Sequence, residues 1–248
     1  MVGDLHGMAH AFDGLLTLAG FDPARDLVWS LGDLVDRGPF SPRCLELLDQ
    51  SWFRAIRGNH EQLMLDALDE PETWLMWTLN GGDWATDYPW DDPALRRKLL
   101  DLPWAADLRT AQGRIGLVHA DLDLGLSWTR FLEVIELDIG QARTVALWSR
   151  TSISRAARGF PGPRVKDVDL VLLGHSIVEQ AFPWGSLWFL DSGAVVSQDP
   201  SAALSMLEVH PDLRLWTLPT AFDPIAEQWW AGHQERVAAA VDARPPAP

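Results

Sequence analysis

Short apolar runs alternate with longer amphipathic segments along the first two thirds of the chain. Five of the runs are followed at once by a small polar cluster that contains glycine, histidine or both. They lie at residues 1–2, 27–31, 53–57, 115–118 and 170–173. Short apolar runs that end in such clusters are typical of buried strands. Residues 8–19 and 41–50 lie between the first three runs and carry apolar residues at helical spacing. The pattern therefore predicts an α/β core.

The rest of the chain is expected to complete one domain over residues 1–237. Residues 60–105 predict a helical cover rich in tryptophan, and residues 150–167, rich in arginine, glycine and proline, predict a long ordered loop near the site. Three further apolar runs predict consecutive strands at residues 186–190, 203–207 and 213–216. Residues 238–248 are rich in alanine and proline and predict a flexible tail. The first strand has only two residues, short for a central strand, which suggests a late or clipped start.

Each of the five polar clusters carries residue types that bind divalent metal ions. Carboxylate, amide and imidazole ligands suit hard and borderline divalent ions, and strand ends in an open α/β sheet face a common crevice. The candidate ligands are Asp4, His6, Asp33, Asn59, His119 and His175. Their number fits two ions, with the first two residues on one ion and the last three on the other. Asp33 can bridge the ions, because a carboxylate has two oxygens. An isolated Gly-Asp or Gly-His pair is more often a turn, so the repetition at five strand ends favours the metal site.

Longer motifs surround these candidate ligands. They are Gly3-Asp4-Leu5-His6-Gly7, Gly32-Asp33-Leu34-Val35-Asp36-Arg37-Gly38, Gly58-Asn59-His60-Glu61, His119-Ala120-Asp121 and Gly174-His175-Ser176. In this order they resemble the motifs of the phosphoprotein phosphatase branch of the calcineurin-like metallophosphoesterases. Trp148-Ser149-Arg150, together with residues 80–84 and 191–195, resembles the bacterial and lambda-phage type of serine/threonine protein phosphatase. The resemblance covers residues 3–197.

The resemblance implies a fold, a cofactor and a chemistry. The fold is an α/β sandwich of two sheets flanked by helices. The cofactor is a pair of divalent metal ions, manganese first, with iron, zinc or magnesium as alternatives. The chemistry is hydrolysis of phosphate esters through attack by a hydroxide that bridges the two metals.

The resemblance also implies roles for five further residues. His60 resembles the general acid that protonates the leaving alkoxide, and Asp36 resembles the carboxylate that orients His60. Taken by itself, Asp36 could instead pair with Arg37 on the surface. Arg37, Arg57 and Arg150 match positions that hold phosphate oxygens, a task that suits the planar fork of guanidinium.

Composition narrows the class of protein. A net charge of −15 argues against broad nucleic-acid binding, although two bound cations would reverse the field locally and admit a phosphorylated substrate. No apolar run is long enough to cross a membrane, and the chain does not start with the basic-then-apolar pattern of a secretory signal. Cys44 is the only cysteine, which excludes an intrachain disulfide. We therefore expect a cytoplasmic protein whose partner is a phosphorylated protein or peptide; the sequence leaves its oligomeric state open.

The sequence is compatible with three functional hypotheses. A serine/threonine protein phosphatase is favoured. A symmetrical dinucleoside tetraphosphate hydrolase, or another small-molecule phosphoesterase, would share the metal centre. The motif of the symmetrical hydrolases that resembles residues 32–38, however, typically has alanine at the position of Asp36. A non-catalytic metal-binding scaffold would have lost ligands or the acid, and the chain has all of them. The tryptophans of residues 74–104 could wall a peptide groove, yet packing of a helical cover is the simpler interpretation.

Overall fold

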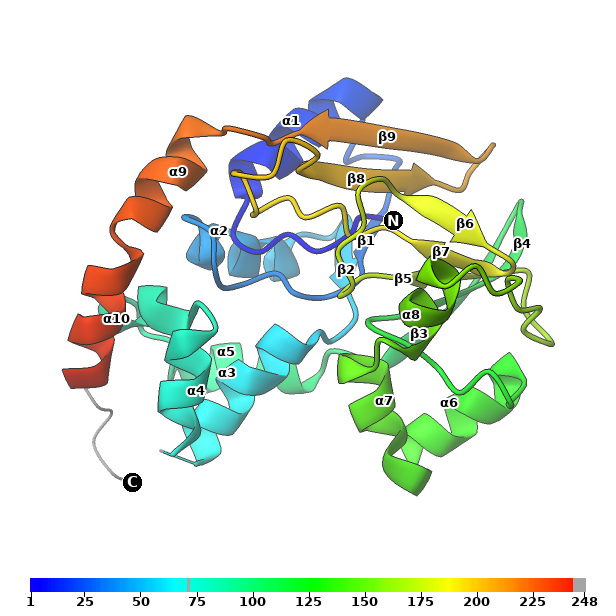
Figure 1. Ribbon diagram of the computed structural model, residues 1–248, viewed down its shortest axis with the longest axis horizontal. Coiled ribbons are helices and arrows are strands. Elements are labelled where there is room, and N and C mark those ends of the chain that lie inside the picture. The colour runs from blue at the N-terminus through cyan, green and yellow to red at the C-terminus, as the bar shows by residue number, and fades with distance from the viewer. Residues whose placement is uncertain (71, 243–248) are drawn as a thin grey trace.

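Two β-sheets form the centre of the molecule in the computed structural model, which describes residues 1–70 and 72–242 (Figure 1). The first sheet joins a parallel pair, β1 (Val28–Ser30) and β2 (Phe53–Ala55), to an antiparallel pair, β8 (Ala203–Glu208) and β9 (Arg214–Pro219). Val2 connects the two pairs, since it bridges in parallel to Ser30 and in antiparallel to Met206. The short first run of the sequence therefore occupies the middle of a sheet.

The second sheet has five strands in the order β3-β4-β5-β7-β6. The strands are β3 (Ala105–Thr110), β4 (Gly113–Val118), β5 (Leu170–Leu173), β6 (Phe182–Trp184) and β7 (Leu187–Phe189). The three central strands β4, β5 and β7 are parallel, and β3 and β6 pair in antiparallel at the two edges. The parallel centre brings the loops after β4 and β5 to the same edge of the sheet.

The core follows the alternation of side chains along the strands. Between the sheets, Ile115 and Leu172 of the second sheet pack in one cluster with Leu207 of the first. Val171 and Leu173 flank Leu172 and belong to a separate cluster that contains helical residues. Because successive side chains of a strand point to opposite faces, the second sheet buries one face on the first sheet and the other on helices. The molecule is therefore a sandwich of two sheets with helices outside, as the sequence predicted.

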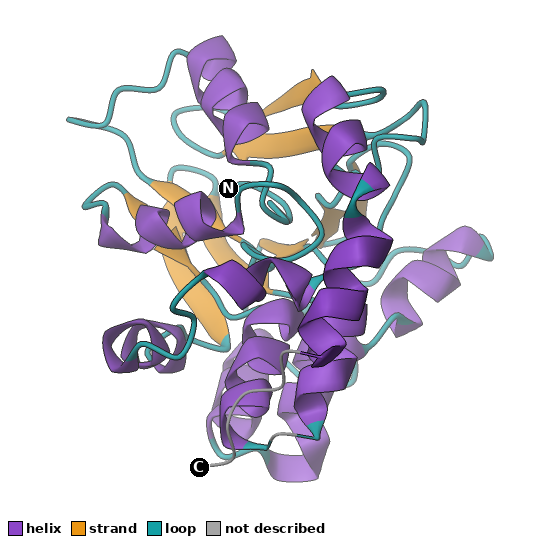
Figure 2. Cartoon of the chain, turned by 90° about the vertical axis from the view of Figure 1, so that its left-hand side faces the viewer, coloured by secondary structure: helices purple, strands orange, loops and turns teal. Residues whose placement is uncertain are grey.

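Helices cover the outer faces of both sheets (Figure 2). The helices whose side chains pack into the core cluster of the first sheet are α1 (Ala9–Ala19), α2 (Ser41–Glu46), η1 (Leu47–Asp49), α3 (Asn59–Asp69), α4 (Thr73–Leu79), η2 (Gly82–Asp87), α5 (Pro93–Leu100), α9 (Pro224–Ala231) and α10 (His233–Asp242). On the second sheet lie α6 (Trp128–Glu136), η3 (Ile139–Gln141), α7 (Ala142–Trp148) and α8 (Thr151–Ala157). We call the segment from α3 to α5 the cover; it lies where residues 60–105 predicted helices.

Local signals fix several helix ends. Helix α1 stops at Gly20, whose φ of +67° lies in the left-handed region that glycine tolerates. Helix α9 begins after Asp223, whose carboxylate accepts hydrogen bonds from the N–H groups of Ile225 and Ala226. Pro224 occupies the first helical position, where its missing N–H costs nothing.

Three sequence-based expectations need correction. Strands β3 and β6 were missed; β3 is an edge strand whose mixed polar and apolar residues give no continuous apolar run. The loop expected at residues 150–167 begins with helix α8, because the distant carboxylate of Asp121 accepts hydrogen bonds from the N–H and hydroxyl of Ser152. Residues 238–242 of the expected tail lie in α10, and residues 243–248 lie outside the described residues.

Candidate metal centre

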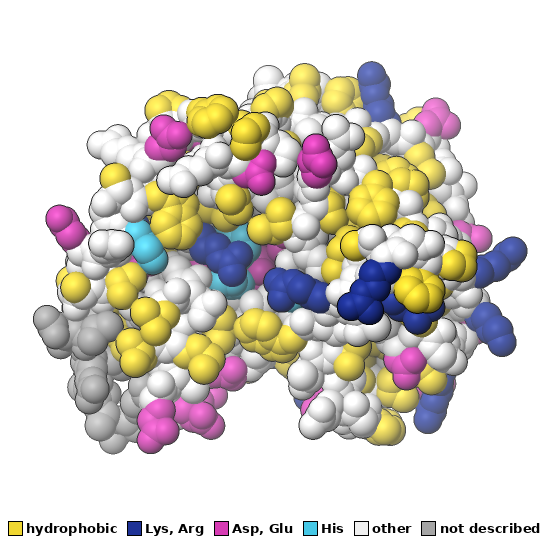
Figure 3. Space-filling model, in the orientation of Figure 1, with side chains coloured by type: hydrophobic (Ala, Val, Ile, Leu, Met, Phe, Trp, Pro, Cys, Tyr) yellow, Lys and Arg dark blue, Asp and Glu magenta, His cyan; other side chains and the backbone are white. Residues whose placement is uncertain are grey.

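The polar clusters that follow the strands meet at one edge of the sandwich. Asn59, the first residue of α3 after β2, presents Oδ1 at 2.9 Å from Nε2 of His119, which follows β4. The same oxygen lies 2.8 Å from Nδ1 of His175, which follows β5. Figure 3 shows a hollow on this face in which histidine, acidic and basic side chains gather. The fold thus brings together residues that are more than 100 positions apart in the chain.

Two groups of donor atoms share Asp33. One group contains His6, Asp33 and His60, and the other contains Asp33, His119 and His175, with the donor atoms of each group within 4.8 Å of one another. Nε2 of His6 lies 3.5 Å from Asp33 Oδ2, whereas Nε2 of His119 lies 3.4 Å from Asp33 Oδ1. Each oxygen of Asp33 therefore faces a different group, as a carboxylate between two ions requires.

Buried atoms without partners test whether metal ions fit here. Among the described residues, neither Oδ1 of Asp4 nor Nε2 of His175 has a hydrogen-bond partner, although both are buried. Oδ2 of Asp4 accepts from the His175 N–H at 2.9 Å, which holds the carboxylate in place. A Cβ at Gly174 would overlap Oδ1 of Asp4, so glycine is required there. Leaving a buried polar atom unpaired costs about 1–3 kcal/mol, and ligation by a divalent ion removes that cost. The residues fit the metal ions that the sequence predicted.

Backbone carbonyls fix the tautomers of two histidines. Nδ1 of His6 lies 2.9 Å from the carbonyl oxygen of Val35, and Nδ1 of His119 lies 2.8 Å from that of Leu31. A carbonyl only accepts, so Nδ1 carries a proton in both rings and Nε2 is the nitrogen that can bind a metal ion. In both residues Nε2 is the atom that faces Asp33.

Positive charge would stabilise the buried carboxylates of the site. Burial, reinforced by the nearby Asp191 carboxylate, raises the pKa of Asp4 well above its ordinary value. Burial lowers the pKa of His119, but the charge of Asp33 and the hydrogen bond to it outweigh burial and raise that pKa to about 10. Asp33 thus draws a proton onto His119, and a divalent cation would take the place of that proton.

His60 and Asp36 form a buried pair beside the metal ligands. Nδ1 of His60 lies 2.6 Å from Oδ2 of Asp36, and neither side chain is measurably exposed. Burial lowers the pKa of His60 to about 3, against the opposing charge of Asp33. Because Asp36 occupies Nδ1, only Nε2 of His60 faces Asp33, at 3.9 Å from its Oδ2. The alternative for Asp36, a surface ion pair with Arg37, does not form, since Asp36 is buried.

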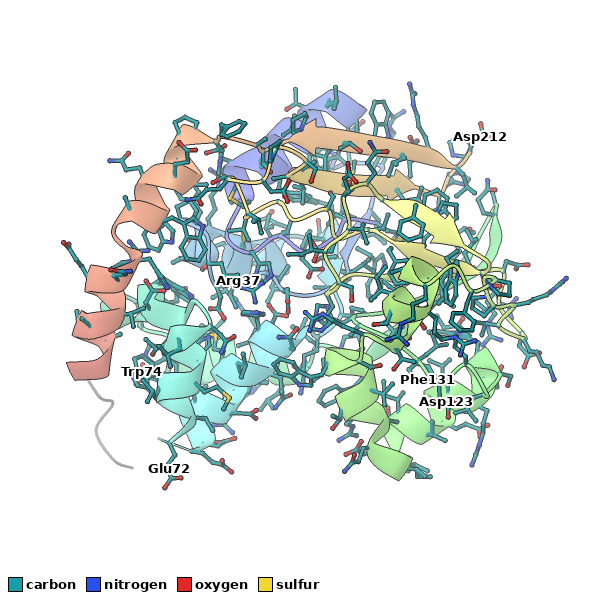
Figure 4. The ribbon with its side chains drawn as sticks, viewed as in Figure 1. Arg37, Glu72, Trp74, Asp123, Phe131 and Asp212 are labelled. Carbon is teal, nitrogen blue, oxygen red and sulfur yellow. The ribbon has the colours of Figure 1, made fainter. Side chains whose placement is uncertain are left out.

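The three candidate phosphate-binding arginines have different surroundings. Nη1 of Arg37 lies 3.1 Å from Nε2 of His6, and Arg37 lies near the middle of the face shown in Figure 4. Nη2 of Arg150 donates to the His175 carbonyl oxygen at 3.4 Å, so both arginines lie beside ligand residues. The Arg57 guanidinium donates to the carbonyl of Leu100 at 2.7 Å and to Oε1 of Gln62 at 3.0 Å. A phosphate contact by Arg57 therefore stays a prediction, and it would compete with these two bonds.

Comparison with known proteins identifies the family. Residues 1–179 match the model of the calcineurin-like phosphoesterases. The chain belongs to the calcineurin-like phosphoesterase family. It is 34% identical to serine/threonine-protein phosphatase 1 of Salmonella typhimurium over 200 residues, which cover 79% of this chain and 86% of the relative.

Two further comparisons concern the nucleotide hydrolases of the family. The chain is 45% identical to the symmetrical bis(5'-nucleosyl)-tetraphosphatase of Edwardsiella ictaluri, but over only 67 residues, which cover 26% of this chain and 24% of that protein. A solved structure assigned provisionally as a diadenosine tetraphosphatase superposes with a TM-score of 0.62 at 20% identity, covering 88% of this chain and 91% of the other. At that identity the likeness supports the calcineurin-like fold alone.

Family membership confirms the predicted fold class and makes the chain a hydrolytic metallophosphoesterase with a divalent metal centre. In the part of the chain that the structure describes, no helix is both long and apolar enough to span a bilayer.

Glu61 is a buried residue of the phosphoesterase motifs to which the sequence assigned no role. Its Oε2 accepts from the N–H groups of Asp33 and Gly58 at 2.9 and 2.8 Å, and its Oε1 accepts from Leu34 N–H at 2.7 Å. Glu61 therefore ties the loop after β1 to the start of α3. The one sequence feature that could have indicated a role for Glu61 is its position in the third motif, directly after Asn59 and His60.

Asp121 has a similar supporting role for Arg150. Its carboxylate accepts from the hydroxyl of Ser149 at 3.1 Å and from the N–H and hydroxyl of Ser152 at 2.8 and 2.6 Å. These bonds fix the segment on either side of Arg150. The Asp121 position lies in the fourth motif, but its partners lie about 30 residues away and no sequence pattern connects them.

Proposed function

We propose that this calcineurin-like phosphoesterase is a serine/threonine protein phosphatase that hydrolyses phosphate monoesters of phosphorylated proteins or peptides. The observation that carries the proposal is the buried pair of His60 and Asp36, 2.6 Å apart and next to Asp33. Serine and threonine leave as alkoxides, which need a proton in the transition state. The nucleotide that leaves when a phosphoanhydride is hydrolysed departs through a phosphate oxygen, which is already a weak base and gains little from such an acid.

Six residues would hold two divalent metal ions, with manganese as our proposal for the metal. They are Asp4, His6, Asp33, Asn59, His119 and His175. Bound there, two ions supply an activated water and neutralise charge on the phosphoryl group.

The other residues of the site position the substrate and deliver a proton. Arg37 and Arg150 bind phosphate oxygens, for which a guanidinium offers parallel N–H donors. Asp36 accepts a hydrogen bond from the Nδ1–H of His60 and thereby directs Nε2 toward the reacting phosphate. His60, protonated at Nε2, then donates that proton to the leaving oxygen of serine or threonine.

The similarity to serine/threonine-protein phosphatase 1 over most of both chains supports this substrate class. We include a cytoplasmic location in the proposal, because the single cysteine, Cys44, is free and buried. The shorter match to the symmetrical tetraphosphatase keeps a second substrate class, dinucleoside tetraphosphates, in the test below.

The test compares two substrates on protein stripped of metal, with and without added manganese. We expect manganese-dependent release of phosphate from a phosphothreonine peptide, with diadenosine tetraphosphate spared. The reverse preference would move the function to nucleotide hydrolysis and leave the metal site intact. Manganese binding with neither activity would refute the phosphatase proposal and favour a scaffold.

A further inference from the structure

The Asp36 carboxylate receives two hydrogen bonds from tryptophans of the cover. Nε1 of Trp84, in η2, donates to Oδ1 at 2.7 Å, and Nε1 of Trp77, in α4, donates to Oδ2 at 2.9 Å. Trp77 and Trp84 are 0% and 6% exposed, so no water competes for these bonds. Oδ2 also accepts a hydrogen bond from His60, so both oxygens of Asp36 accept from donors whose positions are fixed by the fold.

Close packing holds both indoles in place. The rings of Trp77 and Trp84 meet edge to face with centroids 6.0 Å apart, and Trp77 also packs against Trp74 and Trp90 at 5.4 and 5.0 Å. A Cβ at Gly82 would lie 2.6 Å from the Trp77 ring, so only glycine allows this approach. The indole N–H groups therefore point at Asp36 from a rigid wall.

The cover also holds the backbone next to Asp36. Asp36 and Arg37 have φ angles of +73° and +68°, in the left-handed region that residues other than glycine rarely adopt. The Arg37 N–H donates to the carbonyl oxygen of Gly81 at 3.2 Å, and a Cβ at Gly81 would lie 2.6 Å from that nitrogen. Such strained conformations persist only where neighbours determine them, and here the neighbour is the loop between Trp77 and Trp84.

We propose that Trp77 and Trp84 are positioning residues, which orient the Asp36 carboxylate so that Asp36 in turn orients the proton donor His60. This inference rests on the proposed function. An indole N–H can only donate, so the two indoles fix both oxygens of Asp36 as acceptors, and Oδ2 also accepts from the Nδ1–H of His60. Because Nδ1–H is bound to Asp36, Nε2 is the nitrogen of His60 that can carry the proton for the leaving group. The tryptophans then serve the acid, in addition to packing the cover.

Phenylalanine variants separate the hydrogen bond from the packing, because they keep most of the ring and remove the N–H. Trp74 offers a matched control on the same cover (Figure 4). It is buried, and its Nε1 donates to the carbonyl oxygen of Ala240 at 2.9 Å, not to Asp36. Trp74→Phe therefore removes an equally buried indole hydrogen bond without touching the acid pair.

The kinetic test uses the manganese-loaded enzyme with two leaving groups. We expect Trp84→Phe to lower kcat on a phosphothreonine peptide on the order of tenfold, the effect of losing one hydrogen bond to a charged acceptor. On p-nitrophenyl phosphate, whose leaving group barely needs a proton, we expect less than about a twofold change. Trp74→Phe should leave both rates within about twofold, because phenylalanine keeps a ring beside Trp77 and the lost N–H donates to Ala240, not to Asp36. In a His60→Asn background, Trp84→Phe should cause no further loss on the peptide.

A second readout needs no turnover and no tryptophan variant. In proton NMR spectra of the metal-free protein, the Nδ1–H of His60 should give a downfield resonance protected from exchange. Asp36→Asn should remove it and shift the indole N–H resonances of Trp77 and Trp84, while that of Trp74 stays in place. If the two indole resonances do not respond to Asp36→Asn, the proposed contacts are wrong.

The outcomes distinguish this inference from the function on which it rests. If His60→Asn kept full turnover on the peptide, the assignment of the acid would be wrong and the inference would fall with it. If His60→Asn were impaired while Trp84→Phe and Trp74→Phe lost activity equally, the acid would stand and the positioning role would be refuted. A Trp84→Phe loss that persists in the His60→Asn background would also refute it.

Discussion

The ion pair between Arg236 and Asp83 is expected to stabilise the attachment of α10 to the cover. Nε of Arg236 donates to Oδ2 of Asp83 at 2.7 Å, and Nδ1 of His233 lies 3.3 Å from Oδ1. The Asp83 side chain is 1% exposed and that of Arg236 is 24% exposed. Asp83 directly precedes Trp84, so this pair connects the last described helix to the part of the cover that contacts Asp36.

Arg236→Met is the informative change, because it removes the charge and keeps an apolar stem. Breaking a buried ion pair by removing one partner costs about 3–5 kcal/mol. Since Arg236 is partly exposed, we expect Arg236→Met to lower the free energy of unfolding by about 3 kcal/mol, at the lower end of that range. About 1 kcal/mol of this comes from the lost stacking of Arg236 on Trp229. For a chain of this size that corresponds to a fall in Tm of about 6–12 °C. Arg96→Met is the control, because the Arg96–Asp69 pair has similar distances but is 35% and 58% exposed.

The assay is chemical and thermal denaturation of both variants, with hydrogen exchange of α10 to detect local detachment. We expect Arg96→Met to lower the free energy of unfolding by about 0.5 kcal/mol, as is usual for exposed ion pairs. The double-mutant cycle of Arg236→Met with Asp83→Asn isolates the pair from the Trp229 contact, and its coupling energy should be about 2 kcal/mol. Equal destabilisation by Arg236→Met and Arg96→Met, with unchanged exchange in α10, would refute the argument from burial.

Three further predictions concern the site and the core. His60→Asn should lower turnover of an alkyl phosphate by about 100-fold or more and leave manganese stoichiometry unchanged, whereas Asp33→Asn should remove metal and activity together, as measured by elemental analysis and kinetics. Gly174→Ala should lose metal affinity, measured by titration calorimetry, because its Cβ overlaps Asp4; unchanged affinity would contradict the ligand role of Asp4. Burial raises the pKa of the Cys44 thiol to about 12, so the thiolate fraction at pH 8 is roughly one in ten thousand. A disulfide reagent should therefore modify the unfolded chain stoichiometrically and the native chain very slowly, and fast native labelling would contradict the burial of Cys44.

The convergence of the candidate metal ligands could be predicted from the sequence because each follows a strand or the short first run within a few residues. Asp33 and Asn59 follow parallel strands of one sheet, where the rule that parallel strand ends share an edge brings them together. His119 and His175 follow parallel strands of the other sheet, and the packing of the two sheets brings the two sets together. The strands themselves were predicted where a continuous apolar run marks them. Edge strand β3 has no such run, because its side chains alternate between the core and solvent.

The supporting contacts could not be predicted, because they join residues that no local pattern relates. Trp77 and Trp84 lie 41 and 48 residues from Asp36, and their sequence context indicates only a packed helical cover. The same holds for Asp121, which shapes helix α8 from 31 residues away. Periodicity specifies which face of a helix is buried, but the atom to which a buried indole N–H donates depends on the packing of several elements at once.

The chemistry of the site is divided between two parts of the fold. The candidate metal ligands follow Val2 and strands of both sheets, on loops and, for Asn59, at the first residue of α3, so the strands fix the distances between them. Among the described residues, the side chains that donate to the Asp36 carboxylate are His60, at the start of α3, and the two tryptophans further along the cover. A variant that loosens the cover should therefore impair proton donation before it impairs metal binding. Arg236→Met provides that case, because it removes the partner of Asp83 next to Trp84. We expect it to lower turnover of a phosphothreonine peptide more than that of p-nitrophenyl phosphate, at unchanged manganese content. Equal loss on both substrates would show that the cover supports the metal centre as well, and would contradict this division.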